Sequence, residues 1–176
     1  CASFVFKPSV VETKIIEAGE ATPPVNFEFM GRVLVKGGNK GFSGGIRWSH
    51  VSTVDNIHLL SPFGQVVAEI KSSEGAALLT TSEQRIYRAA NVENLIKQVL
   101  GWRLPILGLQ YWVRGVNAPK TKSEIDRDAD GRVIGIRQDG WTITYTSYFP
   151  SKLIKTERPR VLVLKRSNLK IKLVID

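Results

Sequence analysis

Apolar and polar residues alternate along most of this chain, which is the pattern of half-buried β-strands. Phe27–Lys36 is the clearest run, and the last run places Leu169, Ile171, Leu173 and Ile175 on one face. Comparable runs predict strands near residues 42–48, 57–60, 66–70, 76–79, 85–89, 123–127, 132–138, 141–145 and 161–165. About ten or eleven short antiparallel strands favour a curved sheet or a barrel.

One stretch between these strands has a helical period instead. Its apolar positions, spaced i, i+3, i+4, i+7 and i+8, are Val92, Leu95, Ile96, Val99 and Leu100. Asn91 is a suitable N-cap and Gly101 a suitable stop. A second helix is expected between Pro105 and Gly115, and it is apolar nearly all round, so it should be covered on most sides. A mainly β chain with one helical hairpin predicts a sheet with a lid.

The first residues are harder to interpret. Val10, Val11, Ile15 and Ile16 could form one side of a short helix that ends near Gly19, before the Thr22-Pro23-Pro24 linker. We therefore expect an N-terminal segment over residues 1–24 and a single domain over residues 25–176.

The composition is that of an ordinary globular protein, with 43% apolar and 23% charged residues, and no apolar run is long enough for a transmembrane helix. The net charge of +9 points to an anionic partner or surface. Phospholipid head groups and nucleic acid are both candidates, and charge alone does not choose between them. The commoner interpretation of the basic residues near the C-terminus is a solvated strand face.

The only cysteine is Cys1, which excludes an internal disulfide and a cysteine-based zinc site. It has two interpretations. The sequence could simply start at this residue, or Cys1 could be the lipid-bearing residue of a processed lipoprotein.

Few residues suggest catalysis or metal binding. Asp126, Asp128, Asp130 and Gly131 resemble the start of a calcium loop, but the twelfth position is Arg137 where the ion needs an acid. A charged hairpin turn is the prediction there. His50 and His58 have no partner at metal spacing and are expected at the surface or at strand edges. We expect no enzyme activity, no metal site and no cofactor.

The turn formed by Ser61, Pro62, Phe63 and Gly64 is different, because an aromatic residue at a turn tip tends to be exposed. An exposed Phe63 would mark a contact with a partner or a membrane. Alternatively, the turn folds back and Phe63 covers the core.

Taken together, these motifs resemble the family of the outer-membrane lipoprotein receptor LolB from about Phe27 to the C-terminus. The elements that carry the resemblance are Gly31-Arg32, Trp48, Leu59–Gln65, Leu100-Gly101-Trp102-Arg103-Leu104-Pro105, Tyr111–Gly115, Ala118-Pro119, Gln138–Trp141 and Pro159-Arg160. The first twenty residues show no convincing match.

The resemblance implies an unclosed antiparallel barrel of about eleven strands with a helical lid over an apolar cavity. It further implies a receptor in the cell outer membrane, facing the periplasm, that takes lipoproteins from the carrier LolA and inserts them into the outer membrane. Partners would be LolA, acylated lipoproteins and outer-membrane phospholipid, with the receptor itself a monomer. Cys1 matches the lipid-anchored cysteine of the family, and Pro62, Phe63 and Gly64 match its membrane-inserting loop, where leucine is common at the tip.

Carrying acyl chains through water requires a closed apolar compartment, because each exposed CH₂ group costs about 0.8 kcal/mol. The candidate lining residues on the sheet are Phe29, Val33, Ile46, Trp48, Ile57, Leu59, Ile70, Trp141, Ile143 and Tyr145, and those on the helices are Leu95, Ile96, Val99, Trp102, Leu109 and Trp112. The same residues could instead form a packed core.

Two other classes remain open at this point. A soluble periplasmic carrier of the same fold should lack the anchoring cysteine and the loop aromatic. A basic nucleic-acid-binding barrel would place aromatics between Lys and Arg, whereas here most aromatics fall on the apolar strand phase.

Overall fold

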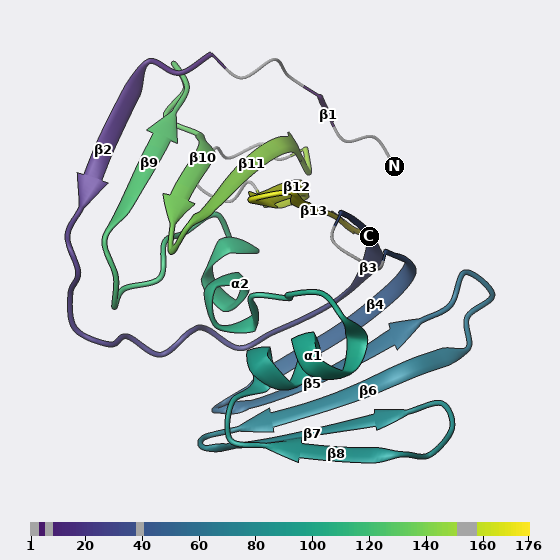
Figure 1. Ribbon diagram of the computed structural model, residues 1–176. Helices are drawn as coiled ribbons and strands as arrows, with labels where there is room; N and C mark the ends of the chain where they lie inside the picture. The colour runs from purple at the N-terminus through teal and green to yellow at the C-terminus, as the bar shows by residue number, and fades with distance from the viewer. Residues whose placement is uncertain (1–3, 6–8, 38–40, 151–157) are drawn as a thin grey trace. The chain divides into compact units, whose positions relative to one another are not determined.

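The computed structural model describes residues 4–5, 9–37, 41–150 and 158–176 (Figure 1). Within them lie thirteen β-strands and two α-helices, grouped into two compact units. The structure has two strands more than the eleven that alternation predicts, and both are formed by N-terminal residues.

One unit comprises Val25–Ile106 with Ile175–Asp176. Its sheet has the order β3-β4-β5-β6-β7-β8, with every neighbouring pair antiparallel and consecutive in the chain. The strands are β3 (Phe27–Lys36), β4 (Phe42–Val51), β5 (Val54–Leu60), β6 (Val66–Ser73), β7 (Ala76–Thr81) and β8 (Ile86–Ala89), followed by helix α1 (Val92–Leu100). Such a meander needs only short hairpin connections.

The other unit comprises Cys1–Pro24 with Leu107–Val174. Its sheet has the order β2-β9-β10-β11-β12-β13, and β1 also pairs with β11. The elements are β1 (Phe4–Val5), β2 (Glu12–Ile16), α2 (Ile106–Trp112), β9 (Ser123–Arg127), β10 (Val133–Gln138), β11 (Trp141–Tyr148), β12 (Pro159–Arg166) and β13 (Leu169–Ile175). The expected fold class, mainly antiparallel β with a helical pair between two runs of strands, is confirmed.

Helix α1 begins and ends as the sequence predicts. The Asn91 side chain accepts a hydrogen bond from the Asn94 backbone N–H at 2.9 Å, which satisfies one of the free donors of the first turn. Gly101 ends the helix in the left-handed conformation, with φ of 87°. Val92, Leu95 and Ile96 are buried, so the predicted apolar stripe is the packed face.

The prediction of a short N-terminal helix is wrong, because those residues form strand β2. β2 pairs with β9 over Glu12–Ile16, and the Thr13 hydroxyl donates to Asp126 Oδ1 at 2.7 Å. A helix this short is marginal by itself in water, so pairing with an available strand edge decides the conformation. The apolar residues that suggested a helix face, Val10, Val11 and Ile15, are more than half exposed.

Candidate functional site

The apolar rows predicted for the β3–β8 sheet lie on one face. Register pairs Phe29 with Trp48 and Trp48 with Ile57, and Ile57 pairs in turn with Ile70. Buried residues of this row are Val33, Ile46, Trp48, Ile57, Leu59 and Ile70. Phe29 is only half-buried, and its ring lies 5.9 Å from that of Trp48.

Helix α1 contacts β7 and β8 of the same unit. Leu95 and Ile96 are buried, whereas Val99 is half-buried near the end of the helix. Trp102 is also buried, and its ring stacks on Phe42 with the centroids 6.0 Å apart. Phe29 and Val99 are therefore the two predicted lining residues that retain exposed surface.

In the other unit, helix α2 is fixed to the sheet by two polar contacts. Trp112 Nε1 donates to Gln138 Oε1 at 2.9 Å, and the Tyr145 hydroxyl donates to the Trp112 carbonyl at 2.5 Å. Burial raises the pKa of the Tyr145 phenol well above its ordinary value, with a smaller effect of Tyr148. The predicted lining residues Leu109, Trp112, Trp141, Ile143 and Tyr145 are all buried.

Gln138 has a structural role in this unit that the sequence analysis did not predict. Its amide Nε2 donates to the Ala118 carbonyl at 2.7 Å and to Thr121, and its Oε1 also accepts from the Ala118 N–H. All the polar atoms of this buried amide are thus used, which holds the chain after α2 against β10. A glutamine that ends a strand just before an Asp-Gly turn gives no sequence signal of such a role.

The prediction that His50 lies at the surface or at a strand edge is wrong. His50 is 2% exposed and its Nδ1 lies 2.7 Å from Asp55 Oδ1, which also accepts from Trp48 Nε1 at 2.8 Å. The tight turn between β4 and β5 places Asp55 opposite His50 in register, so a carboxylate can satisfy both aromatic donors. His58 is partly exposed, with Nε2 3.7 Å from Glu69.

The Ser61–Gly64 turn joins β5 to β6 and presents Phe63 to solvent. The Phe63 side chain is 92% exposed, so it does not fold back over the core. Ser61 Oγ accepts hydrogen bonds from the backbone N–H groups of Phe63 and Gln65, and Gly64 has φ of 85°. Backbone bonds and a left-handed glycine shape this turn, so the aromatic side chain at its tip is not needed to fold it.

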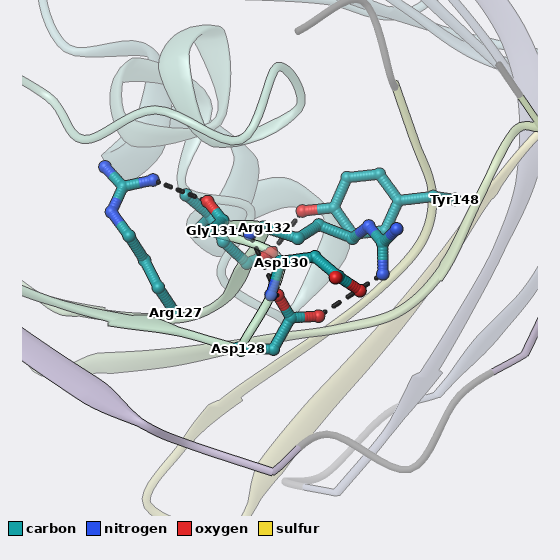
Figure 2. A network of polar contacts seen from close by, with 7 residues as sticks. Arg127, Asp128, Asp130, Gly131, Arg132 and Tyr148 are labelled. Carbon is teal, nitrogen blue, oxygen red and sulfur yellow. Dashed lines mark hydrogen bonds and ion pairs between the residues drawn. The ribbon is translucent and has the colours of Figure 1, made fainter. Parts of the chain in front are cut away.

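The Asp128–Gly131 segment is a charged hairpin turn, as predicted. Asp128 accepts hydrogen bonds from the backbone N–H groups of Asp130 and Arg132 and pairs with the Arg132 guanidinium at 3.3 Å (Figure 2). Arg137, the residue at the twelfth loop position, pairs with Asp126 at 2.6 Å and with Glu124 at 2.9 Å. The arginine beside it lowers the pKa of the Asp126 carboxyl, with the Thr13 hydroxyl adding to the effect and burial opposing it.

The part of the chain that the structure describes contains no group of three His, Cys, Asp or Glu side chains placed to hold a metal ion. In the same residues, neither helix has the length and apolarity needed to span a membrane. Cys1, the predicted lipid site, lies outside the described residues.

Comparison with known proteins places this chain in a family. The family model described as outer membrane lipoprotein LolB matches residues 25–176. The chain belongs to the LolB family. Relatives named outer-membrane lipoprotein LolB include one from Nitrosomonas europaea, 45% identical over 85% of this chain and 71% of the relative. The one from Thiobacillus denitrificans is 38% identical over 83% and 76%, and the one from Cupriavidus metallidurans 33% identical over 96% and 87%.

Membership of the LolB family confirms the resemblance seen in the sequence. It also confirms the expected function, an outer-membrane lipoprotein receptor of the lipoprotein localisation pathway, and the expected localisation at the outer membrane. The nucleic-acid-binding alternative is thereby set aside. The matched range starts at residue 25, so strands β1 and β2 belong to a segment outside the family match.

Proposed function

We propose that this LolB-family chain accepts acylated lipoproteins from the periplasmic carrier LolA, shelters their acyl chains against its apolar rows, and inserts them into the phospholipid of the outer membrane. The receptor acts as a monomer. Its anchor is a lipid on Cys1, the only cysteine of the chain.

The observation that carries this proposal is the exposed ring of Phe63. An aromatic side chain that is 92% exposed at a turn tip gains free energy by entering the acyl boundary of a bilayer. A soluble carrier of the same fold has no use for such a tip, so the feature favours a receptor that delivers cargo to a membrane. Pro62 and Gly64 serve this function by holding the tip in place.

The apolar rows support the acceptance step. Acyl chains need contiguous apolar surface, and within the Val25–Ile106 unit the row that runs through Trp48, Ile57 and Ile70 supplies it. Most of the predicted lining residues are packed in the structure, and the half-buried Phe29 and Val99 are the two that leave apolar surface for cargo to contact.

Binding of a fluorescent fatty acyl probe to the full chain, and its displacement by a diacylated lipopeptide, tests the acceptance step. Val99→Glu should weaken probe binding because it puts a charge on the half-buried side of α1. Gln98→Glu is the matched control, since it adds the same charge to an exposed position of the same helix. Equal effects of the two changes, with both variants folded, would show that α1 is not part of the acyl site.

Lipidation of Cys1 has a direct test by mass spectrometry of protein extracted from its own membrane. A thioether-linked diacylglyceryl group on Cys1 is the expected result. A free thiol at this residue would refute the anchor proposal, but it would not bear on the proposed acyl site.

A further inference from the structure

The sheet of β3–β8 has a second face, opposite the buried row, and one row on that face combines charge with apolar surface. Lys71 on β6 pairs in register with Leu78 on β7, and Leu78 pairs with Arg88 on β8. The adjacent pair, Ile70 and Leu79, is fully buried on the other face. Successive residues of a strand point to opposite faces, so Lys71, Leu78 and Arg88 lie together on the outer face.

This row borders a hollow of about 540 Å³, a volume within the range of ligand sites. Its apolar lining includes Val54, Ala76 and Leu78. Gly75, in the β6–β7 turn, also lines it, and a Cβ placed on that glycine would meet no atom within 4 Å. The hollow is therefore shallow, open at the turn and floored by small side chains.

The charged residues that line the hollow are both basic. Among the described residues that line it, Lys71 and Arg88 carry charge and none is Asp or Glu. Adjacent strands lie about 4.8 Å apart, so the two cations start roughly 10 Å from each other, with Leu78 between them. Glu69 lies 3.4 Å from the Lys71 ammonium and offsets part of its charge, but Arg88 adds a second, forked donor.

We propose that this hollow is a docking site for an acidic peptide segment of a soluble protein partner, with a carboxylate bound by Lys71 and Arg88 and a neighbouring apolar side chain over Leu78 and Ala76.

A free phosphate would leave the apolar floor unused. A lipid head group is disfavoured by position, because the hollow and Phe63 lie at opposite ends of the β5–β6 hairpin, roughly 20 Å apart along the strands. When Phe63 enters a bilayer, the hollow is left accessible to soluble partners. The site uses the face of the sheet opposite the acyl rows, so it does not depend on the proposed cargo site.

Fluorescence anisotropy with the full chain tests this site. The probe is a labelled, blocked peptide of alternating Leu and acidic residues, Leu-Asp-Leu-Glu-Leu, and its neutral twin has Asn and Gln in place of Asp and Glu. The acidic peptide should bind, and the neutral twin should bind about tenfold more weakly, the effect of two exposed charge contacts. Lys71→Gln with Arg88→Gln should cause the same loss for the acidic peptide.

The matched control is Lys170→Gln with Lys172→Gln, which removes the same charge from exposed positions of β13. This control should leave peptide binding unchanged. An equal loss of peptide binding in both double variants would mean that only the net charge of the protein matters, and it would overturn the proposed site. Ala76→Phe, at an exposed position, should block the peptide while acyl-probe binding persists. Full peptide binding by Ala76→Phe would also overturn the proposal.

Two further probes test whether the anion that binds Lys71 and Arg88 is a peptide carboxylate, a free phosphate or a lipid head group. Inorganic phosphate competing at the same concentration as the peptide would show that the apolar floor plays no part. Phosphatidylglycerol vesicles that lose affinity in the Lys71/Arg88 variant, with peptide binding absent, would assign the hollow to a membrane surface instead. Either result would overturn the peptide site.

Discussion

Two hairpin turns of this receptor have similar backbones, but one has an apolar side chain at its tip and the other has charged side chains. The turn after β5 and the turn after β9 each contain a glycine in the left-handed conformation, Gly64 with φ of 85° and Gly131 with φ of 78°. Each also has a side-chain oxygen, Ser61 Oγ in one and Asp128 Oδ1 in the other, that accepts two backbone N–H groups. Local backbone chemistry is therefore sufficient to build both turns.

The side chains at the tips differ. In the β9–β10 turn two arginines bind the turn itself: Arg132 pairs with Asp128, and Arg127 donates to the Gly131 carbonyl (Figure 2). In the β5–β6 turn the tip residue is Phe63, with 92% of its surface exposed. The turn that resembles a calcium loop is thus structural, and the turn with no titratable group is the one that leaves an apolar tip exposed.

The largest effect that separates the turns should come from Phe63→Glu. Loss of a phenyl ring from the bilayer removes about 1.5–3 kcal/mol of transfer free energy, so delivery of lipoprotein from loaded receptor to liposomes should fall about tenfold to a hundredfold. The melting temperature should hardly move, because the ring is already exposed.

Phe63→Leu is the matched control for that change and should deliver cargo at nearly the rate of the unmodified protein. A stable Phe63→Glu protein that delivers at the normal rate would refute membrane insertion by this turn. Accumulation of loaded, stable receptor would place the defect at delivery rather than at acceptance.

Alternation and helix period were sufficient to predict most of this fold. Each of the eleven strands read from alternation is present, and α1 runs from Val92 to Leu100 with the predicted cap and stop. These signals are local, since a strand or helix face is encoded within the element itself. The exposed Phe63 was one of two open interpretations, and only the structure decided between them.

What the sequence missed depends on partners distant in the chain. The residues of β2 form a strand because Thr13 and its neighbours pair with β9, more than a hundred residues later. Gln138 anchors Trp112 across a loop, which no local pattern encodes. His50 and Asp55 are close in sequence, but their pairing follows from the register across the β4–β5 turn rather than from any spacing rule.

A second way to sharpen the comparison is Asp126→Asn, two residues before the charged turn. The variant loses the ion pair with Arg137, which should cost about 2 kcal/mol at neutral pH. The folded-state pKa of Asp126 is held below its ordinary value of 3.8, first by the hydrogen bond from Arg137. Its stabilising contribution is therefore complete above that ordinary value and is lost as the pH falls through the lowered folded-state pKa.

Urea unfolding of both proteins between pH 7 and pH 2 measures this dependence. The difference in unfolding free energy should be constant from pH 7 to about pH 5 and shrink below pH 4. The same series on Phe63→Leu should show no pH dependence of its own, because the β5–β6 turn has no titratable group. A difference that grows toward low pH would contradict the assignment to Asp126.

The third change, Asp128→Ala, removes the side chain that accepts from the Asp130 and Arg132 backbones. It should lower the unfolding free energy by about 1.5 kcal/mol, since the turn donors are returned to water rather than buried. Asp128→Asn keeps one acceptor oxygen and should cost about half as much. Calorimetric melting of the two variants gives the comparison, and equal losses would mean that the Arg132 ion pair, rather than the backbone bonds, supplies the stability.

The smallest expected difference comes from alanine at the two turn glycines. Neither Gly64 nor Gly131 has an atom within 4 Å of the site where a Cβ would lie, so only the left-handed backbone opposes the substitution. Gly64→Ala and Gly131→Ala should therefore each cost about 1 kcal/mol, with a difference between them of roughly 0.3 kcal/mol or less. Denaturant midpoints at one pH measure both. A much larger cost at Gly131 would mean that the polar contacts of the charged turn cannot adapt to a small backbone shift. Near equality would leave Phe63, rather than backbone rigidity, as what distinguishes the two turns.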